Sequence, residues 1–82
     1  MNIGTRFIKS AERPYTEDGA KGLHCTEVMY EVTSTDRGGF EAKAVEVVSE
    51  SGRPSFAGNP LGVSMAWFGW EAALARGDVR EV

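Results

Sequence analysis

His24 and Cys25 are adjacent residues whose side chains could support nucleophilic or metal chemistry. A thiol nucleophile needs a base within hydrogen-bonding distance and a third group that orients this base. Neighbouring residues in a β-strand point to opposite faces, so a strand would keep the imidazole and the thiol apart. Zinc takes three or four ligands, whereas the chain has one His and one Cys. We therefore expect no catalytic residue, no cofactor and no metal, and an enzyme or metal site around His24 and Cys25 ranks third among the functions considered.

The carboxylates are the next group that could do chemistry. Glu27 and Glu31 fall on one face of a predicted strand, with Glu41 and Glu46 on the strand that follows. Acid–base catalysis needs one carboxyl desolvated so that its pKa rises, whereas alternating charges are the ordinary solvated side of a sheet. A second interpretation is that Glu27 and Glu31 bind a partner, presenting negative charge to a basic groove on another protein.

Nucleic acid and nucleotides are disfavoured as ligands. The chain carries nine Lys and Arg against twelve Asp and Glu, a net charge of −3, and no glycine run is followed by Lys-Ser or Lys-Thr. Arg37 and Arg53 both fall in predicted turns. With the basic residues near the N-terminus they support the alternative function, a small nucleic-acid-associated domain.

The length and composition favour a single small cytoplasmic domain. Eighty-two residues leave room for one core, so residues 1–82 are predicted to form one α+β domain. The lone Cys25 excludes an internal disulfide and fits a reducing compartment. No signal peptide is visible, and no apolar stretch reaches the roughly 18–20 residues that span a bilayer, so we expect no membrane partner.

The residue pattern predicts a small antiparallel sheet of three to four strands with one C-terminal helix packed on it, in the order β-β-β-(β)-α. Residues 10–22, with Pro14 and Gly19, are predicted to be a flexible loop. Residues 40–50 fit either a strand or a helix; we favour a strand with a bulge near Ala44–Val45. The expected strands are residues 3–8, 24–34 and 40–50, with a short edge strand at 55–57 and hairpin glycines at Gly38 and Gly39.

The C-terminal helix is predicted to start at Asn59-Pro60 and to end at Arg76, before a helix-stopping Gly77. The tail after it is either a last short strand or frayed. At 100° per residue the segment shows two apolar stripes on opposite sides, where a helix on one sheet should have a polar back. The stripe expected to face the sheet is Val63, Trp67, Trp70 and Leu74, and the second is Leu61, Met65, Phe68, Ala72 and Ala75.

The order of three strands followed by a capped helix resembles, in outline, double-stranded-RNA-binding domains and several small phage-encoded inhibitors. The RNA-binding family carries a lysine cluster at the start of its last helix. Here that position reads Asn59-Pro60-Leu61-Gly62-Val63-Ser64, so RNA binding does not follow from the resemblance.

These observations lead to the expectation of a non-enzymatic protein-interaction module. The second stripe would contact another protein or a second copy of the chain, since exposed Met and aromatic side chains are typical of interfaces. The alternative is that the loop at residues 10–22 and the C-terminal tail fold over Met65 and Phe68, which would make this stripe part of the core. The expected partner-binding residues are Leu61, Met65, Phe68, Ala72, Glu27 and Glu31. A small acidic domain of this kind fits an inhibitor or adaptor that docks on a larger complex, with anti-CRISPR-like phage proteins as the narrower class.

Overall fold

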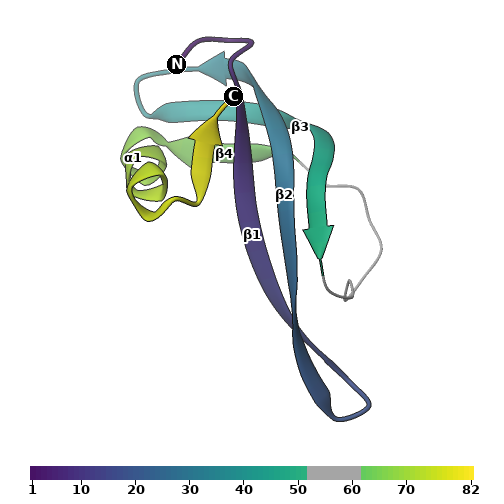
Figure 1. Cartoon of the computed structure of the whole chain (residues 1–82). Coiled ribbons are helices and arrows are strands. Elements are labelled where there is room, and N and C mark those ends of the chain that lie inside the picture. Colours follow the sequence, from purple (N-terminus) through teal and green to yellow (C-terminus); the bar gives the residue numbers. More distant parts are fainter. Residues whose placement is uncertain (52–61) are drawn as a thin grey trace.

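The structure is a computed structural model that describes residues 1–51 and 62–82. Its elements are β1 (Arg6–Glu17), β2 (Ala20–Thr35), β3 (Gly39–Ser51), β4 (Val63–Ala66), α1 (Trp67–Arg76) and β5 (Val79–Glu81). The strands form one antiparallel sheet in the order β4-β3-β2-β1-β5. Helix α1 covers one face of this sheet near the end where both chain termini lie (Figure 1). The predicted antiparallel sheet with one helix is right in outline, but the strand count of three to four is wrong, because the described residues form five.

The segment predicted to be a loop, residues 10–22, lies within a long hairpin instead. β1 and β2 pair without interruption from Arg6↔Glu31 to Glu17↔Ala20. Asp18 and Gly19 both have positive φ, 50° and 79°, which is the geometry of a tight two-residue hairpin turn. This hairpin extends beyond the rest of the sheet as a two-stranded arm (Figure 1). The loop prediction failed because both faces of the arm meet solvent, so its strands show no apolar alternation.

Pro14 fits this arm because of the direction in which its backbone nitrogen points. The Ser10 N–H donates to the Asp78 carbonyl, on the side of β1 away from β2. Backbone groups alternate in direction along a strand, so Pro14, four residues further, also directs its nitrogen to that side. β5 pairs only with Phe7, Ile8 and Lys9, so no ladder bond to a described strand is lost at Pro14. Proline at such an edge also discourages pairing with another chain.

The ambiguous residues 40–50 are a strand, as favoured, and the expected bulge is present. Val45 has no partner between Met29↔Glu46 and Tyr30↔Ala44, and Val48 is skipped in the same way further along β3. The hairpin loop before β3 also lies where it was predicted. Its glycines, however, do not have positive φ. Gly39 leaves no room for a side chain, because a Cβ at this position would lie 2.0 Å from the Met65 carbonyl oxygen.

The predicted helix from Asn59 to Arg76 is wrong in its first part. Val63 to Ala66 form β4, which pairs with Gly39–Ala42 of β3, and α1 begins only at Trp67. The reason is tertiary, because pairing with β3 satisfies backbone groups that a helix would otherwise satisfy internally. Within β4, Val63 and Met65 pack against the core. The predicted turn and edge strand at 51–57, the helix start at Asn59-Pro60, Leu61 and Arg53 involve residues outside the described ranges.

The end of α1 and the tail follow the sequence pattern. Gly77 adopts the left-handed conformation with φ 80°, its N–H donates to the Leu74 carbonyl, and the Asp78 N–H donates to the Ala73 carbonyl. The chain then turns back so that β5 pairs with β1 at Phe7–Lys9. The tail is therefore the short strand that was one of the two alternatives.

The core lies between α1 and the face of the sheet that it covers, which we call the inner face. Trp70 is at its centre: its ring meets Phe7 edge-on at a centroid distance of 4.9 Å and Phe40 at 5.5 Å. The buried residues of this core are Phe7, Val28, Tyr30, Val32, Phe40, Ala42, Trp70, Ala73 and Val79. The predicted apolar face of the second strand, Val28, Tyr30 and Val32, is thereby confirmed.

Candidate interaction surfaces

The solvent side of α1 carries an apolar stripe of Phe68, Ala72 and Ala75, which we call the outer stripe. These residues are spaced i, i+4 and i+7 and therefore share one side of the helix. All three are exposed, and Phe68 is 82% exposed, the largest value among the large hydrophobic residues of the described chain. Glu71 and Arg76 flank the stripe on its two sides. Within the described residues, the Phe68 ring is therefore left largely open to solvent.

The structure retains only part of the predicted second stripe. Phe68 and Ala72 lie on the exposed side of α1 as expected. Met65 is not on the helix: it lies in β4 opposite Phe40 and packs against the core. Leu61 lies outside the described residues. The stripe is thus shorter than predicted, because it cannot extend past the first residue of α1.

The stripe predicted to face the sheet is also altered. Trp70 is 6% exposed and Ala73 is 3% exposed, so these two residues form the buried side of α1. Trp67 is half-buried, and its indole Nε1–H donates to the Asp36 carbonyl at 2.8 Å. Leu74 was expected to be buried but is 43% exposed. A helix of ten residues makes fewer than three turns, and Leu74 lies past the edge of its contact with the sheet.

The turn between β2 and β3 holds the start of α1 in place. The Asp36 carboxylate accepts hydrogen bonds from the Gly38 and Gly39 N–H groups, at 2.7 and 2.9 Å. The Trp67 N–H then donates to the Gly38 carbonyl at 3.1 Å. Because this turn fixes Trp67 through both its backbone and its indole, the neighbouring Phe68 is presented from a rigid position.

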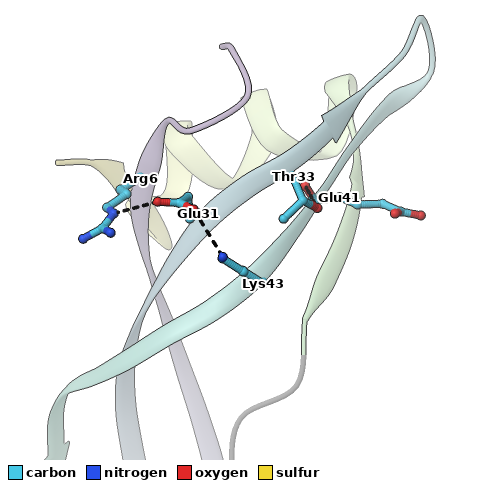
Figure 2. Close-up of polar contacts among 5 residues, drawn as sticks. All are labelled: Arg6, Glu31, Thr33, Glu41 and Lys43. Carbon is cyan, nitrogen blue, oxygen red and sulfur yellow. Dashed lines mark hydrogen bonds and ion pairs between the residues drawn. The ribbon is translucent and has the colours of Figure 1, made fainter.

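The face of the sheet opposite α1, which we call the outer face, carries a chain of ion pairs across three strands. Arg6 of β1 donates to Glu31 of β2 at 3.1 Å, and Lys43 of β3 lies 3.5 Å from the other oxygen of Glu31 (Figure 2). The hydrogen bond from Arg6 is the main cause that holds the pKa of Glu31 below its ordinary value, and the positive charge of Lys43 adds to it while desolvation opposes it. The charge of Glu31 is therefore balanced by its neighbours.

The negative charge of Glu27 is also balanced by a neighbouring cation. Its carboxylate accepts a hydrogen bond from Arg80 of β5 at 2.6 Å, so the contact reaches across β1. Ile8, the Cα partner of Arg80, is only 8% exposed although it alternates with Phe7 and so faces away from the helix. This ion pair thus joins β5 to the sheet beside a covered apolar residue. The sequence could not reveal it, since the tail had no assigned position.

Glu41 of β3, another carboxylate predicted on the central strands, lies beside Thr33 (Figure 2). It is exposed, and its carboxylate accepts a hydrogen bond from the Ser34 hydroxyl at 3.4 Å. On the outer face, Arg6 and Lys43 adjoin Glu31, and Arg80 adjoins Glu27, so both of these carboxylates are paired with cations. The prediction that Glu27 and Glu31 bind a partner assumed a continuous negative surface, and these ion pairs interrupt it.

His24 and Cys25 both lie in β2, so their side chains point to opposite faces, as predicted for a strand. His24 Nε2 lies 2.8 Å from Glu50 Oε1 of β3, and Cys25 is a half-buried free thiol. Within residues 1–51 and 62–82, no three His, Cys, Asp or Glu side chains are grouped so that they could hold a metal ion. The arrangement offers a cross-strand hydrogen bond and no proton relay to the thiol.

Changing these two residues tests whether they take part in function. Cys25→Ser and His24→Ala are each expected to leave activity unchanged, measured as partner binding or biological effect. The loss of the His24–Glu50 contact should lower the free energy of unfolding by about 1 kcal/mol or less, since Glu50 is half exposed. A melting curve for each variant provides the control. Loss of activity in a variant that melts like the wild type would restore the enzyme or metal hypothesis.

Four of the cations in the described residues are paired with carboxylates, namely Arg6, Lys43, Arg76 and Arg80. Arg37 is exposed in the turn between β2 and β3, and the second turn arginine of that hypothesis, Arg53, lies outside the described ranges. Phosphate binding requires several cations on one face.

No protein-family model matches the chain, and neither the curated proteins nor the solved structures searched contain a match. In residues 1–51 and 62–82, no helix has the length and apolar character needed to cross a membrane.

Proposed function

We propose that this protein is a non-enzymatic protein-interaction module that docks on a larger protein or complex through the outer stripe of α1. The observation that carries the proposal is the 82% exposure of Phe68 on a helix that packs against the sheet through Trp70 and Ala73. Transferring a Phe side chain from water into an apolar pocket contributes about 1.5–3 kcal/mol. Binding energy in protein interfaces is concentrated in a few such anchor residues.

The rigidity of the helix supports this proposal. Trp70 is fixed among Phe7 and Phe40, and Trp67 is hydrogen-bonded to the turn at Asp36. An anchor on an element that is already ordered loses little conformational entropy on binding, so more of its contact energy appears as affinity. Ala72 and Ala75 have small side chains and allow a partner to approach the helix closely beside Phe68.

Of the partner-binding residues predicted from the sequence, Phe68 and Ala72 belong to the proposed docking surface, whereas Glu27 and Glu31 do not. The ion pairs with Arg80, Arg6 and Lys43 balance those two carboxylates, which weakens the case for a negative docking face. An inhibitor or adaptor in the cytoplasm is the functional class proposed, in keeping with the free thiol of Cys25. An inhibitor of host defence complexes of the anti-CRISPR kind is the narrower form of the same proposal.

Phe68→Ser tests the proposed function. The change should shift the free energy of unfolding by no more than about 0.5 kcal/mol, because Phe68 is exposed and Phe and Ser have similar helix propensities. Binding should weaken by about 2 kcal/mol or more, roughly 30-fold, if Phe68 is an anchor. The measurement is a pull-down from the native host with tagged wild type and variant, followed by titration of the retained protein.

Leu23→Ser is the matched control. Leu23 is 47% exposed and lies on the β1–β2 arm, so the variant removes a similar apolar side chain from another part of the surface. It should leave the retained protein and its affinity unchanged. If instead Phe68→Ser binds like the wild type and retains full biological effect, the outer stripe is not the docking surface.

A further inference from the structure

The two flanks of the outer stripe differ in charge. Arg76, on one flank, pairs with Asp78 at 2.8 Å. Glu71, on the other flank, is exposed and takes part in none of the ion pairs found in the described chain. The proposed docking surface therefore consists of the protruding Phe68 ring and two alanines, beside the negative charge of Glu71, which is unpaired within the described residues.

This charge disfavours a contact with a second copy of the chain in which the two α1 helices pair antiparallel. In a symmetric contact the same surface is used twice, so antiparallel pairing of two α1 helices would place Phe68 of one copy against Ala75 of the other. The midpoint of that pairing lies between residues 71 and 72, so Glu71 would face Glu71 of the second copy on the same flank. Like charges set opposite each other in an interface are unfavourable.

The size of the stripe leads to the same conclusion. A helix of ten residues is about 15 Å long and 10 Å wide, so one side of it offers a footprint on the order of 150 Å². A stable interface buries about 800 Å² on each partner. Two such convex helix sides in contact fall well short of that area, whereas a concave partner can enclose Phe68 and reach the surface around it.

We infer that the outer stripe binds a different protein, one that offers an apolar pocket for Phe68 with a Lys or Arg side chain at the rim facing Glu71. This inference rests on the proposed function and names the chemistry of its partner. It also predicts the effect of one nearly isosteric change. Glu71→Gln removes the charge and keeps the shape, so it should slow association with a basic rim, while it should strengthen a symmetric dimer by removing the repulsion between the two copies.

The first experiment uses the chain alone. Sedimentation velocity of the full-length wild type, Glu71→Gln and Phe68→Ser, from micromolar to millimolar concentration, should show a monomer in all three. A dimer that Glu71→Gln tightens and Phe68→Ser abolishes would overturn the inference. The proposed interaction function would survive that result, with a second copy as the occupant.

The second experiment identifies the occupant and measures the charge effect. The full chain with a photoreactive benzoyl-phenylalanine in place of Phe68 should crosslink in the native host to a protein other than itself, and the same probe in place of Leu23 should not.

Once the crosslinked protein has been purified, its association rate with the Glu71→Gln variant should be roughly two-fold or more slower than with the wild type at 50 mM salt, and this difference should decrease as the salt concentration increases. An unchanged association rate would overturn the basic rim, and a crosslink from position 23 alone would overturn the stripe. No adduct at either position, together with full biological effect of Phe68→Ser, would contradict the proposed function itself.

Discussion

Trp70→Ala is expected to lower the free energy of unfolding by about 3–5 kcal/mol, the cost of removing a buried aromatic side chain from a packed core. Trp70 is 6% exposed and meets the rings of both Phe7 and Phe40. Small domains have about 5–15 kcal/mol of total stability, and this chain has a small core, so the variant should be largely unfolded at 37 °C. Urea denaturation followed by circular dichroism measures the loss.

Trp67→Ala is the informative comparison. Trp67 is half-buried, and its replacement removes the hydrogen bond to Asp36 and the contact with Phe40 at 5.3 Å. Its cost should therefore be clearly smaller than that of Trp70→Ala, whereas the sequence pattern placed the two tryptophans on one buried stripe. Leu74→Ala should cost least of the three, since Leu74 is 43% exposed. An equal loss for Trp67 and Trp70 would mean that the helix packs on the sheet at a different rotation.

Gly39→Ala is expected to destabilise the protein by about 3 kcal/mol or more, at the upper end of the cost of overpacking. A Cβ at this position would lie 2.0 Å from the Met65 carbonyl oxygen and 2.9 Å from the Ala66 Cα. Both atoms belong to the backbone of β4, so no side-chain rotation can relieve the clash. β4 would have to move away from β3, and the hydrogen bond between the Trp67 N–H and the Gly38 carbonyl would be strained with it.

Gly69→Ala provides a matched control with the opposite sign. Gly69 is inside α1, and a Cβ there would find no atom within 4 Å. The same chemical change should therefore stabilise the protein by about 0.5–1 kcal/mol, because Ala is the better helix former. Chemical denaturation of both variants, with backbone NMR shifts of β4, checks the prediction. If Gly39→Ala were tolerated as well as Gly69→Ala, β4 would not pair with β3 as closely as the structure shows.

Much of the fold could be predicted from the local pattern of apolar residues and glycines, wherever one side of a helix or strand is buried. The alternation of Val28, Tyr30 and Val32 predicted a central strand and its inner face, and Gly77 predicted the end of the helix. The phase slip near Ala44 predicted a bulge, which lies at Val45. In each case the signal comes from the residue itself or from its neighbours in the chain. An apolar side chain that must be buried, or a glycine that can take positive φ, leaves a trace in the sequence.

The arm and the strand β4 could not be predicted in this way. The strands of the arm pair along their whole length, but both of their faces meet solvent, so burial imposes no alternation on residues 10–22. Val63 to Ala66 have residues that suit a helix, and they form a strand because β3 offers them an open edge beside Gly39. Propensity is a weak preference that a partner strand readily outweighs.

The candidate site also combines features that the local sequence pattern predicts with features that depend on tertiary contacts. The sequence by itself determined that Phe68 and Ala72 are apolar residues one helical turn apart, on the side of the segment opposite Trp70. Only the tertiary structure decided that Met65 packs inward, that Trp70 rather than Trp67 is the central core residue, and that Glu27 and Glu31 are balanced by Arg80, Arg6 and Lys43. Periodicity places side chains around one element, whereas burial and charge balance depend on what other elements bring close to them, and that is set by strand pairing between distant parts of the chain.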